Sequence, residues 1–442
     1  MFNWYMSERN WGFKTKALHA GTQPDPQTGA RALPIYQSSA FVFENTEDAG
    51  NLFALQKYGN IYSRIGNPTV SAFEEKIAAL EGGIGAVATS SGMAAQFLTF
   101  AALVGAGDHV VASSALYGGT LTQLDVTLRR FGVDTTFIKS DKAEDFAAAI
   151  TEKTKFVYAE MISNPASQIG DIEALAKVAH DAHLPLIIDS TVATPYLVRP
   201  IEYGADIVLH SATKFLGGHG TTLGGVIVES GKFNWGNGKF PTMTEPVPSY
   251  GGVSWWENFG EFGFLTKVRC EQLRDIGASL SAMSAFLLVQ GVETLPQRMR
   301  DHVANAKVVS QWLESDPRIE WVKYAGLVSH PHNARAQKYL PEGPGSVFSF
   351  GVAAAGLLNG RQTGEKFINS VQLASHLANI GDVRTLVIHP ASTTHRQLTD
   401  VQLLEAGVPQ DLIRISVGLE DIEDILWDLD QALTVATGKA RS

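Results

Sequence analysis

One lysine of the chain stands in a setting that a surface lysine does not need. Lys214 belongs to the segment HSATKFLGGHG (residues 210–220), where Ser211 and Thr213 flank it and a glycine-rich turn follows. The segment overlaps the end of the apolar run ADIVLH, which is typical of a buried strand. A lysine held at the end of a buried strand, between small hydroxyl side chains, could form a Schiff base with a carbonyl compound. Lys214 is therefore the first candidate for a catalytic residue.

Other polar side chains fall where predicted strands end. Ser91, Tyr117, Asn164 and Asp189 lie at or just past the ends of apolar segments, as Lys214 does. In open sheets of parallel strands, ligands bind beyond the carboxyl ends of the strands. One such position would mean little, but five predict a single site.

The residue types at these positions fit the ring of pyridoxal 5'-phosphate (PLP). Lys214 supplies an amine for the aldehyde, and Asp189 a carboxylate that keeps the ring nitrogen protonated, so that the ring can act as an electron sink. Tyr117 can cover the ring, and Asn164 could bond its phenolic oxygen. Each residue alone also has an ordinary structural reading, such as a cap, a turn or a core side chain.

A phosphate site is predicted beside the ring. The segment SSGMAA (residues 90–95) reads as a strand-to-helix turn, and Gly92 allows its backbone N–H groups to approach an anion closely. Ser211 and Thr213 could donate their hydroxyl groups to the same anion. A dinucleotide fingerprint is excluded, because the glycines of GGIGAVA (residues 82–88) precede the strand instead of following it.

These residues require an α/β architecture to position them. From Asn67, a predicted N-cap before Pro68, helical segments alternate with apolar strands such as PLIID, which predicts a mostly parallel sheet covered by helices. We expect three regions: an irregular N-terminal arm over 1–65 that contacts a neighbouring subunit, a large cofactor-binding domain over 66–275, and a smaller α+β C-terminal domain over 276–442. Residues 231–262 read as a long loop with a role near the site or at an interface.

Composition excludes several classes of protein. The 442 residues are 45% hydrophobic and carry a formal net charge of −10, with no basic run, which argues against nucleic acid as a partner. We expect no membrane span and no signal peptide. We also expect no metal site, since His330 and His332 lack a second pair of ligands. With Cys270 as the one cysteine, no intrachain disulfide can form, and we expect a cytoplasmic protein.

The chain resembles the Cys/Met-metabolism family of PLP-dependent enzymes over nearly its whole length. The resemblance rests on long segments in order: ALHAGTQPDPQTGARALPIYQSSAFVF, YSRIGNPT, ATSSGMAA, SNP, IIDSTVATP, HSATKFLGGHG, HPAS and LIRISVGLEDIEDI. It implies fold type I of the PLP-dependent transferases, which is aspartate-aminotransferase-like. The large domain of this fold has a mostly parallel sheet, and a smaller α+β domain follows it.

The resemblance also implies roles for single residues. Lys214 would be the Schiff-base lysine, Asp189 the partner of the ring nitrogen and Tyr117 the stacking ring. Tyr62 and Arg64 would reach the phosphate of a neighbouring subunit, in a homotetramer built as a dimer of dimers. The phosphate of the chain's own site would be held by four residues, Gly92, Met93, Ser211 and Thr213.

Arg414 is implied to clamp the α-carboxylate of the substrate, with help from Asn164 and Ser392. The local pattern agrees, because Arg414 and Ser416 share one face of the predicted strand LIRISV while its apolar residues share the other. An arginine aimed inward needs an anion, and its planar guanidinium suits a carboxylate. A structural ion pair with an acidic side chain is the alternative.

Within the family, the length, the 231–262 segment and NIGDVRTLVIHP resemble the O-acetylhomoserine sulfhydrylase branch. The implied reaction is γ-replacement in methionine biosynthesis: O-acetyl-L-homoserine and sulfide, or methanethiol, give L-homocysteine, or methionine, and acetate. Lys214 would act as general base, assisted by Tyr117 and Tyr62. The alternatives are a cystathionine γ-synthase, a methionine or cystathionine γ-lyase, and a non-catalytic scaffold with the same fold.

Overall fold

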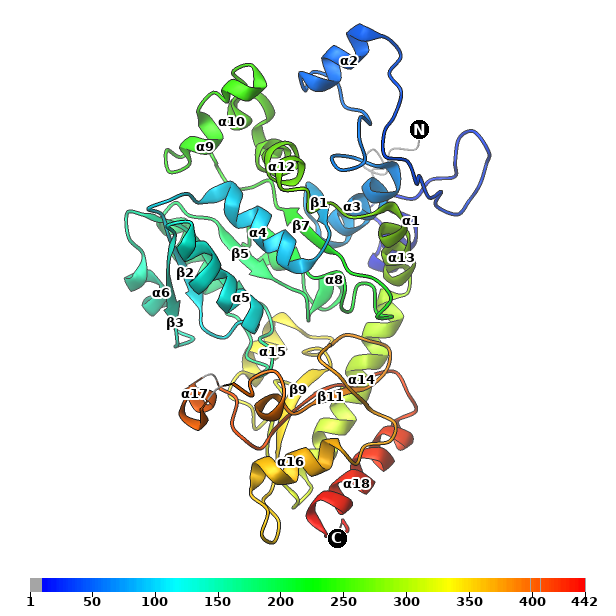
Figure 1. The fold of residues 1–442 in the computed structure, drawn as a ribbon, viewed down its shortest axis with the longest axis vertical. Helices are drawn as coiled ribbons and strands as arrows, with labels where there is room; N and C mark the ends of the chain where they lie inside the picture. Colours follow the sequence, from blue (N-terminus) through cyan, green and yellow to red (C-terminus); the bar gives the residue numbers. More distant parts are fainter. Residues whose placement is uncertain (1–9, 398, 406, 442) are drawn as a thin grey trace. The chain divides into compact units, whose positions relative to one another are not determined.

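The chain forms two compact units in the computed structural model, which describes residues 10–397, 399–405 and 407–441. The first unit comprises the described part of 1–161 together with 171–296, and the second comprises 162–170 with the described part of 297–442. Figure 1 traces the order of the elements along the chain. Among the described residues, no helix combines the length and the apolar character needed to cross a membrane.

A seven-stranded sheet forms the centre of the first unit, in the order β1-β7-β6-β5-β4-β2-β3. β7 is antiparallel to both of its neighbours, β1 and β6, and every other neighbouring pair is parallel. The strands other than β7 therefore all run in one direction, which is the mostly parallel sheet that the sequence predicts. The strands are β1 (Gly85–Thr89), β2 (His109–Ser113), β3 (Asp134–Ile138), β4 (Thr154–Glu160), β5 (Leu186–Asp189), β6 (Ile207–His210) and β7 (Gly225–Glu229).

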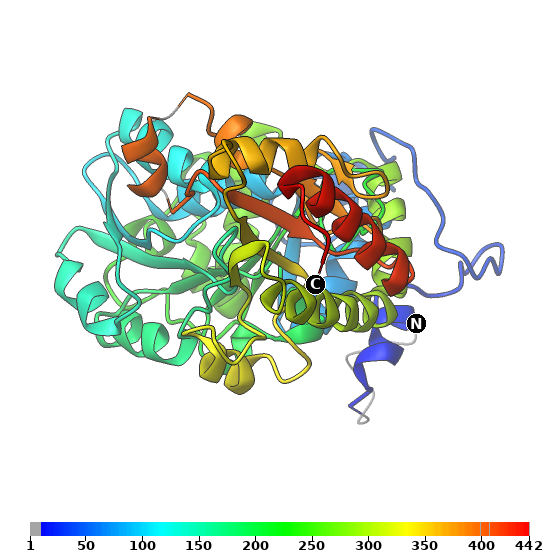
Figure 2. The ribbon, with the colours of Figure 1, turned by 90° about the horizontal axis from the view of Figure 1, so that it is seen from below.

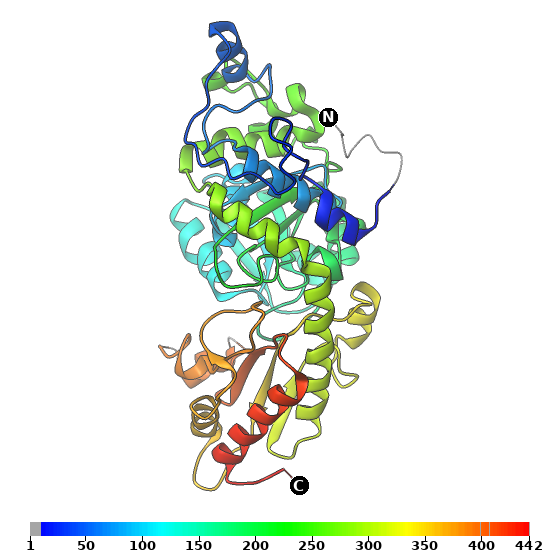
Figure 3. The same ribbon diagram turned by 90° about the vertical axis from the view of Figure 1, so that its right-hand side faces the viewer.

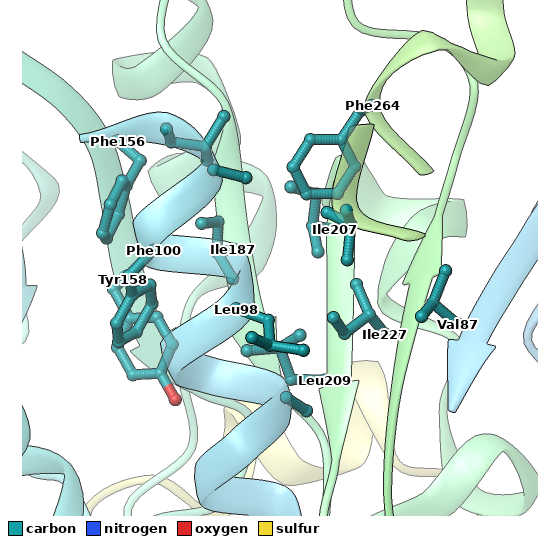
Figure 4. Packing of buried hydrophobic residues seen from close by; sticks show 14 of the residues in the cluster. Val87, Leu98, Phe100, Phe156, Tyr158, Ile187, Ile207, Leu209, Ile227 and Phe264 are labelled. Carbon is teal, nitrogen blue, oxygen red and sulfur yellow. The ribbon is translucent and has the colours of Figure 1, made fainter. Parts of the chain in front are cut away.

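Helices cover both faces of this sheet. Ile187 and Ile188 are neighbours on β5 and point to opposite faces, yet both are fully buried. Figure 4 shows α4 lying along one face, with its Leu98 and Phe100 among apolar side chains of the strands. The α-helices of the unit are α1 (Phe13–His19), α2 (Thr46–Phe53), α3 (Pro68–Glu81), α4 (Gly92–Leu103), α5 (Gly118–Thr122), α6 (Ala143–Ala149), α7 (Ile172–Asp181), α8 (Thr194–Leu197), α9 (Pro241–Thr244), α10 (Trp255–Phe259), α11 (Gly263–Lys267), α12 (Arg274–Ile276) and α13 (Ala282–Glu293).

Local sequence explains where α3 begins and ends. The Asn67 side chain accepts a hydrogen bond from the Thr69 N–H, and Pro68 occupies the first turn, as expected of a helix start. Gly82 ends the helix with a φ of 81°, a left-handed conformation that glycine adopts without strain. Glu74 of this helix forms an ion pair with Arg269 and accepts the Ala88 N–H of β1, so α3 is tied to the edge of the sheet.

The N-terminal arm is more regular than the sequence predicts. The expectation of an irregular segment over 1–65 is wrong for Phe13–His19 and Thr46–Phe53, which are the helices α1 and α2. Asn45 caps α2 by accepting a hydrogen bond from the Asp48 N–H. Helices of two turns are too short to establish a helical period in the sequence, which is why the pattern did not reveal them.

The segment 231–262 is an extension of the core, not a long loop. Trp235, Phe240 and Trp255 are almost completely buried and belong to the same apolar cluster as the sheet residues. Trp235 stacks on Phe264, with ring centroids 5.0 Å apart. The segment contains α9, α10 and two 3-10 turns, η4 (Pro248–Tyr250) and η5 (Gly260–Phe262). Its aromatic residues, which alternate with glycine and proline, are therefore explained by packing.

A buried carboxyl group anchors this segment. The Trp235 indole N–H donates to Oε1 of Glu229 over 2.8 Å, at the end of β7. Glu229 is 1% exposed, and burial raises the pKa of its carboxyl group from 4.5 to about 8. A protonated, neutral glutamic acid is thus the form that the folded protein favours at this position.

The second unit is built on a five-stranded sheet with the order β10-β11-β12-β9-β8. Its antiparallel centre pairs Arg414 of β12 with Ser349 of β9 and with Ile388 of β11. In Figure 2, the orange-to-red elements α16, β12 and α18 lie next to one another, and Figure 3 shows α18 beside α14. The elements are α14 (Leu295–Glu314), β8 (Ile319–Lys323), α15 (Asn333–Tyr339), β9 (Val347–Val352), α16 (Gly360–Ile368), β10 (Ser375–His376), β11 (Leu386–Ile388), α17 (Asp400–Glu405), β12 (Leu412–Ser416) and α18 (Ile422–Thr437).

Glu229→Gln is expected to change how stability depends on pH. Below pH about 4.5 the carboxyl group is protonated in both the folded and the unfolded chain; between about 4.5 and about 8 only the unfolded chain ionises, so the wild type loses stability as pH rises. The variant carries no titrating group at this position. Its free energy of unfolding should therefore rise relative to that of the wild type by an amount on the order of a few kcal/mol as the pH increases across this window. Thermal unfolding of both proteins over that pH range measures the difference.

The exposed Glu152→Gln serves as the matched control for a lost carboxylate. Its unfolding curve should stay parallel to that of the wild type at every pH. If the Glu229→Gln curve is parallel as well, the carboxyl group at 229 does not titrate in the proposed way.

Candidate active site

Strand direction brings most of the predicted residues of the first unit to one edge of the sheet. β1, β2, β4, β5 and β6 run the same way, so their carboxyl ends lie together. Asp189, the last residue of β5, is in register with Glu160 on β4 and Leu209 on β6. The segments that follow three other strands carry further predicted residues: Ser91, Gly92 and Met93 after β1, Tyr117 after β2, and Ser211, Thr213 and Lys214 after β6.

The N-terminus of α4 packs tightly against Ser211. A Cβ atom added to Gly92, the first residue of this helix, would lie 2.6 Å from the Ser211 Cβ atom and 2.9 Å from its Oγ atom. The Ser91 side chain caps the helix by accepting the Ala94 N–H over 3.1 Å. The first N–H groups of a helix have no partner inside it, and the helix dipole is positive there. The arrangement fits a phosphate group beside Ser211.

Lys214 sits in a tight turn after β6. Its N–H donates to the Ser211 carbonyl over 3.1 Å, and its own carbonyl accepts the Gly218 N–H over 2.7 Å. The Thr213 hydroxyl donates to the Gly224 carbonyl and accepts the Gly224 N–H, over 3.2 and 3.0 Å. In this arrangement the Thr213 hydroxyl proton is directed at the Gly224 carbonyl, so its contact with phosphate stays a prediction.

Asp189 is held by two neutral donors. Its Oδ1 atom accepts the Thr191 N–H over 2.9 Å, and its Oδ2 atom accepts Nε2 of Gln96 over 3.1 Å. Among the described residues, no lysine, arginine or histidine forms an ion pair with it. A half-buried carboxylate of this kind lacks a cation, and a protonated ring nitrogen would supply one.

The position of Tyr117 is set by its backbone and by a glycine. Its N–H donates to Oε1 of Glu160 over 2.6 Å, at the end of β4. A Cβ atom at position 119 would lie 2.4 Å from the ring of Tyr117, so Gly119 lets the ring lie along the start of α5. The side chain is 51% exposed, which leaves a ring face open for stacking.

Tyr62 and Arg64 lie on the N-terminal arm. Tyr62 is 44% exposed, and the guanidinium carbon of Arg64 is 5.5 Å from the centre of its ring. Arg64 also donates to the carbonyl oxygen of Arg274. The arm thus presents an aromatic ring and a cation together on its surface.

The remaining three predicted residues, Asn164, Ser392 and Arg414, belong to the second unit. Nη2 of Arg414 donates to the Asn379 carbonyl over 3.0 Å. The Asn164 side-chain oxygen is buried and has no hydrogen-bond partner in the part of the chain that the structure describes, so its amide remains available to a ligand.

A histidine that the sequence did not single out directs the Ser392 hydroxyl. His389 is fully buried, and its Nε2 atom lies 2.7 Å from the Gln410 carbonyl, so Nε2 carries the proton. Burial lowers the pKa of His389, which keeps the ring neutral and makes Nδ1 an acceptor for the Ser392 hydroxyl, 2.8 Å away. The predicted contact of Ser392 with substrate would therefore compete with this bond.

Other residues of the site were missed because their roles depend on contacts across the sheet. The Asp189 carboxylate is bonded by Gln96, the Tyr117 N–H by Glu160, and the Ser211 N–H by Thr191. In none of these pairs do the two residues belong to one sequence motif. Glu160 could have been suspected, since it ends an apolar strand as Asp189 does. Within the described residues, no three His, Cys, Asp or Glu side chains are grouped as a metal site.

Comparison with known proteins places this geometry in a family. The model of the Cys/Met metabolism PLP-dependent enzymes matches residues 14–434. The chain is 51% identical to a sulfhydrylase of Fusarium oxysporum f. sp. lycopersici, over 96% of this chain and 98% of that protein. It is 48% identical to the O-acetyl-L-homoserine sulfhydrylase of Leptospira meyeri, over 96% and 97% of the two chains. It is 50% identical to the homocysteine synthase of Schizosaccharomyces pombe, over 96% and 98%.

Solved structures agree. A crystal structure described as an O-acetylhomoserine (thiol)-lyase of Campylobacter jejuni, which carries a pyridoxyl-lysine phosphate, superimposes with a TM-score of 0.91 at 36% identity, covering 96% of this chain and all of that one. A second structure, of metB from Corynebacterium glutamicum, gives a TM-score of 0.81 at 34% identity, covering 96% and 98%. The predicted α/β fold of type I is thereby confirmed.

Gly92→Ala is expected to weaken PLP binding by about tenfold or more, because the new methyl group must separate Ser211 from the start of α4. Titration of the cofactor-free protein with PLP, followed by calorimetry, measures the affinity. Gly118→Ala is the matched control, since a Cβ atom there has no neighbour within 4 Å. Equal affinities for the two variants would show that close approach at position 92 is not required for binding.

Proposed function

Because the chain belongs to the Cys/Met-metabolism family of PLP-dependent enzymes, we propose that it catalyses γ-replacement in O-acetyl-L-homoserine. Sulfide replaces acetate at Cγ, and the products are L-homocysteine and acetate. The observation that carries the proposal is the 48% and 50% identity, over nearly the whole chain, to an O-acetyl-L-homoserine sulfhydrylase and a homocysteine synthase. Methanethiol in place of sulfide would yield methionine.

The residues of the first unit are suited to hold PLP, which when bound supplies the electron sink for a carbanion at Cα. We assign its covalent attachment to Nζ of Lys214 and its ring nitrogen to Asp189. The phosphate is assigned to the start of α4, with Gly92, Met93 and Ser211, and the face of the ring to Tyr117. The support is the tight contact at Gly92 and the carboxylate of Asp189, which has neutral donors and no cation.

Lys214 moves the protons of the reaction. With PLP bound as the electron sink, Nζ of Lys214 would take the proton from Cα, give that proton up, and then take a second proton from Cβ, so that acetate can leave from Cγ. Sulfide adds at Cγ, and the protons return to Cβ and Cα. Tyr117, and Tyr62 of a neighbouring subunit, assist near the leaving group.

Residues of the second unit are assigned to the substrate carboxylate. Arg414 lies on β12, which is paired with a strand on each side, and this pairing fixes the position of its backbone. Its planar donors suit bidentate contact with a carboxylate. Asn164, whose buried amide oxygen has no partner among the described residues, is assigned to the same ligand, together with Ser392.

The active assembly is proposed to be a cytoplasmic homotetramer, built as a dimer of dimers in which Tyr62 and Arg64 reach the phosphate site of the neighbouring subunit. Support comes from the arm, where apolar side chains are exposed on the single chain: Val42 is 99% exposed, Phe53 61% and Tyr58 87%. Large apolar side chains as exposed as these are expected to be covered by a partner surface.

Lys214→Ala is expected to lose the covalent cofactor. Borohydride reduction followed by mass spectrometry should find a phosphopyridoxyl group on Lys214 of the wild type and none on the variant, and turnover should fall by about a thousandfold or more. Lys177→Ala, a change at an exposed lysine of α7, should keep both the modification and the activity. A phosphopyridoxyl group found on another lysine would overturn the assignment.

The substrate assignment is tested by pairing O-acetyl- and O-succinyl-L-homoserine with sulfide, methanethiol and cysteine. We expect O-acetyl-L-homoserine with sulfide to give an at least about tenfold higher kcat/KM than O-succinyl-L-homoserine with cysteine. Preference for cysteine would indicate a cystathionine γ-synthase. Release of an α-keto acid and ammonia from methionine or cystathionine, without added sulfide, would indicate a lyase.

A further inference from the structure

Gln96 occupies the centre of a buried hydrogen-bond network on α4, one turn after the start of the helix. Its Nε2 atom donates to the Tyr158 hydroxyl over 3.0 Å and to Oδ2 of Asp189 over 3.1 Å. Its Oε1 atom accepts the Thr120 hydroxyl over 3.1 Å. Gln96 is 3% exposed, and Tyr158 and Thr120 are fully buried. Both ends of the amide are therefore engaged away from water.

The chemistry of its neighbours fixes which way the amide points. Turning it over would place Oε1 of Gln96 against the carboxylate of Asp189, where two acceptors would face each other. The pKa of Tyr158 is raised well above its ordinary value, first by burial and then by the charge of Asp189, so it remains a neutral phenol. Figure 4 shows the Tyr158 ring beside Phe100, with its hydroxyl group at the edge of the apolar cluster. With Nε2 toward Asp189 and Tyr158 and with Oε1 toward Thr120, each polar atom of the Gln96 amide meets a matching group.

This arrangement orients Asp189 without neutralising it. Gln96 and the Thr191 N–H hold one carboxylate oxygen each, which fixes the plane of the group. Both donors are neutral, so neither forms an ion pair with the carboxylate. An arginine or lysine in place of Gln96 would form an ion pair and compete with a ligand cation for the same charge. An amide leaves the negative charge for the ligand.

The same amide also reaches the element that carries the stacking ring. Thr120 lies on α5, and its N–H donates to the Tyr117 carbonyl over 2.9 Å. Gln96 is thus bonded to Asp189 on one side and, through Thr120, to the turn of Tyr117 on the other. It connects the two residues assigned to the nitrogen and to the face of one ring.

We propose that Gln96 is a positioning residue that aims the Asp189 carboxylate at the ring nitrogen of PLP, an inference that rests on the proposed role of Asp189. Gln96 itself does not touch the reacting atoms. Its contribution should appear only when the ligand has a nitrogen for Asp189 to meet.

The test compares PLP with its 1-deaza analogue, in which a C–H group replaces the ring nitrogen. Both are titrated into the cofactor-free full-length protein, and dissociation constants are measured by calorimetry. Gln96→Met keeps the length of the side chain and removes its donor and acceptor. We expect this variant to bind PLP about tenfold more weakly than the wild type, because a hydrogen bond to a charged group is lost. Its affinity for the analogue should stay within about threefold of the wild type.

Two further variants separate positioning from packing. Thr120→Val removes the hydroxyl group that donates to Oε1 of Gln96 and leaves Gln96 itself unchanged. It should weaken the binding of PLP more than that of the analogue, but by less than Gln96→Met does. Thr99→Val is the matched control on α4, because the Thr99 hydroxyl is buried and has no partner among the described residues. It should leave both affinities unchanged.

Each remaining outcome has one meaning. Equal weakening for PLP and the analogue in Gln96→Met would show that Gln96 only supports the fold of the site. Unchanged PLP affinity would overturn the inference outright. If the wild type itself does not prefer PLP to the analogue, the assignment of Asp189 to the ring nitrogen fails, which is distinct from failure of the role given to Gln96.

Discussion

The common direction of β1, β2, β4, β5 and β6 is the constraint on which the site of the first unit depends. Because these strands are parallel, the segments that leave their carboxyl ends emerge at one edge, whatever their separation along the chain. Apolar residues on both faces of the strands are buried against helices, and this packing fixes the positions of the strand ends. Side chains more than a hundred residues apart, such as Ser91 and Lys214, are positioned by this geometry and not by local sequence.

Electrostatics at that edge follows a simple division. A helix start and nearby hydroxyl groups offer positive partial charge to an anion, and Asp189 offers a negative charge to a cation. PLP carries both kinds of charge, at opposite ends of one ring. The neutral network around Gln96 supplies no cation to Asp189 from the described residues, and burying such a charge costs stability unless a ligand pairs with it. A site of this kind trades some stability for affinity and orientation.

Close approach of backbone segments is the second requirement. Gly92 lets α4 touch Ser211, and Gly119 lets the Tyr117 ring lie along α5. Larger residues at these positions would move the helix start or the ring by more than the contacts tolerate. The buried aromatic residues of 231–262 add to the core of the same unit, since Trp235 and Trp255 belong to the apolar cluster of the sheet and Trp235 is hydrogen-bonded to Glu229 of β7.

Much of this was readable from the sequence alone. Long apolar strands ending in polar residues predicted the parallel sheet, and the order of SSGMAA, IIDSTVATP and HSATKFLGGHG made Lys214 and Asp189 the candidate site residues, because strand ends and glycine-rich turns leave local patterns. The short helices of the arm and the burial of 231–262 were not readable, since two-turn helices and aromatic clusters have no period. Only the tertiary structure placed Gln96 on Asp189, Glu160 on Tyr117 and His389 on Ser392. Apart from His389 and Ser392, these partners come from different strands and helices. Each bond depends on how a side chain is oriented in the folded protein, and the spacing of residues along the chain does not encode that orientation.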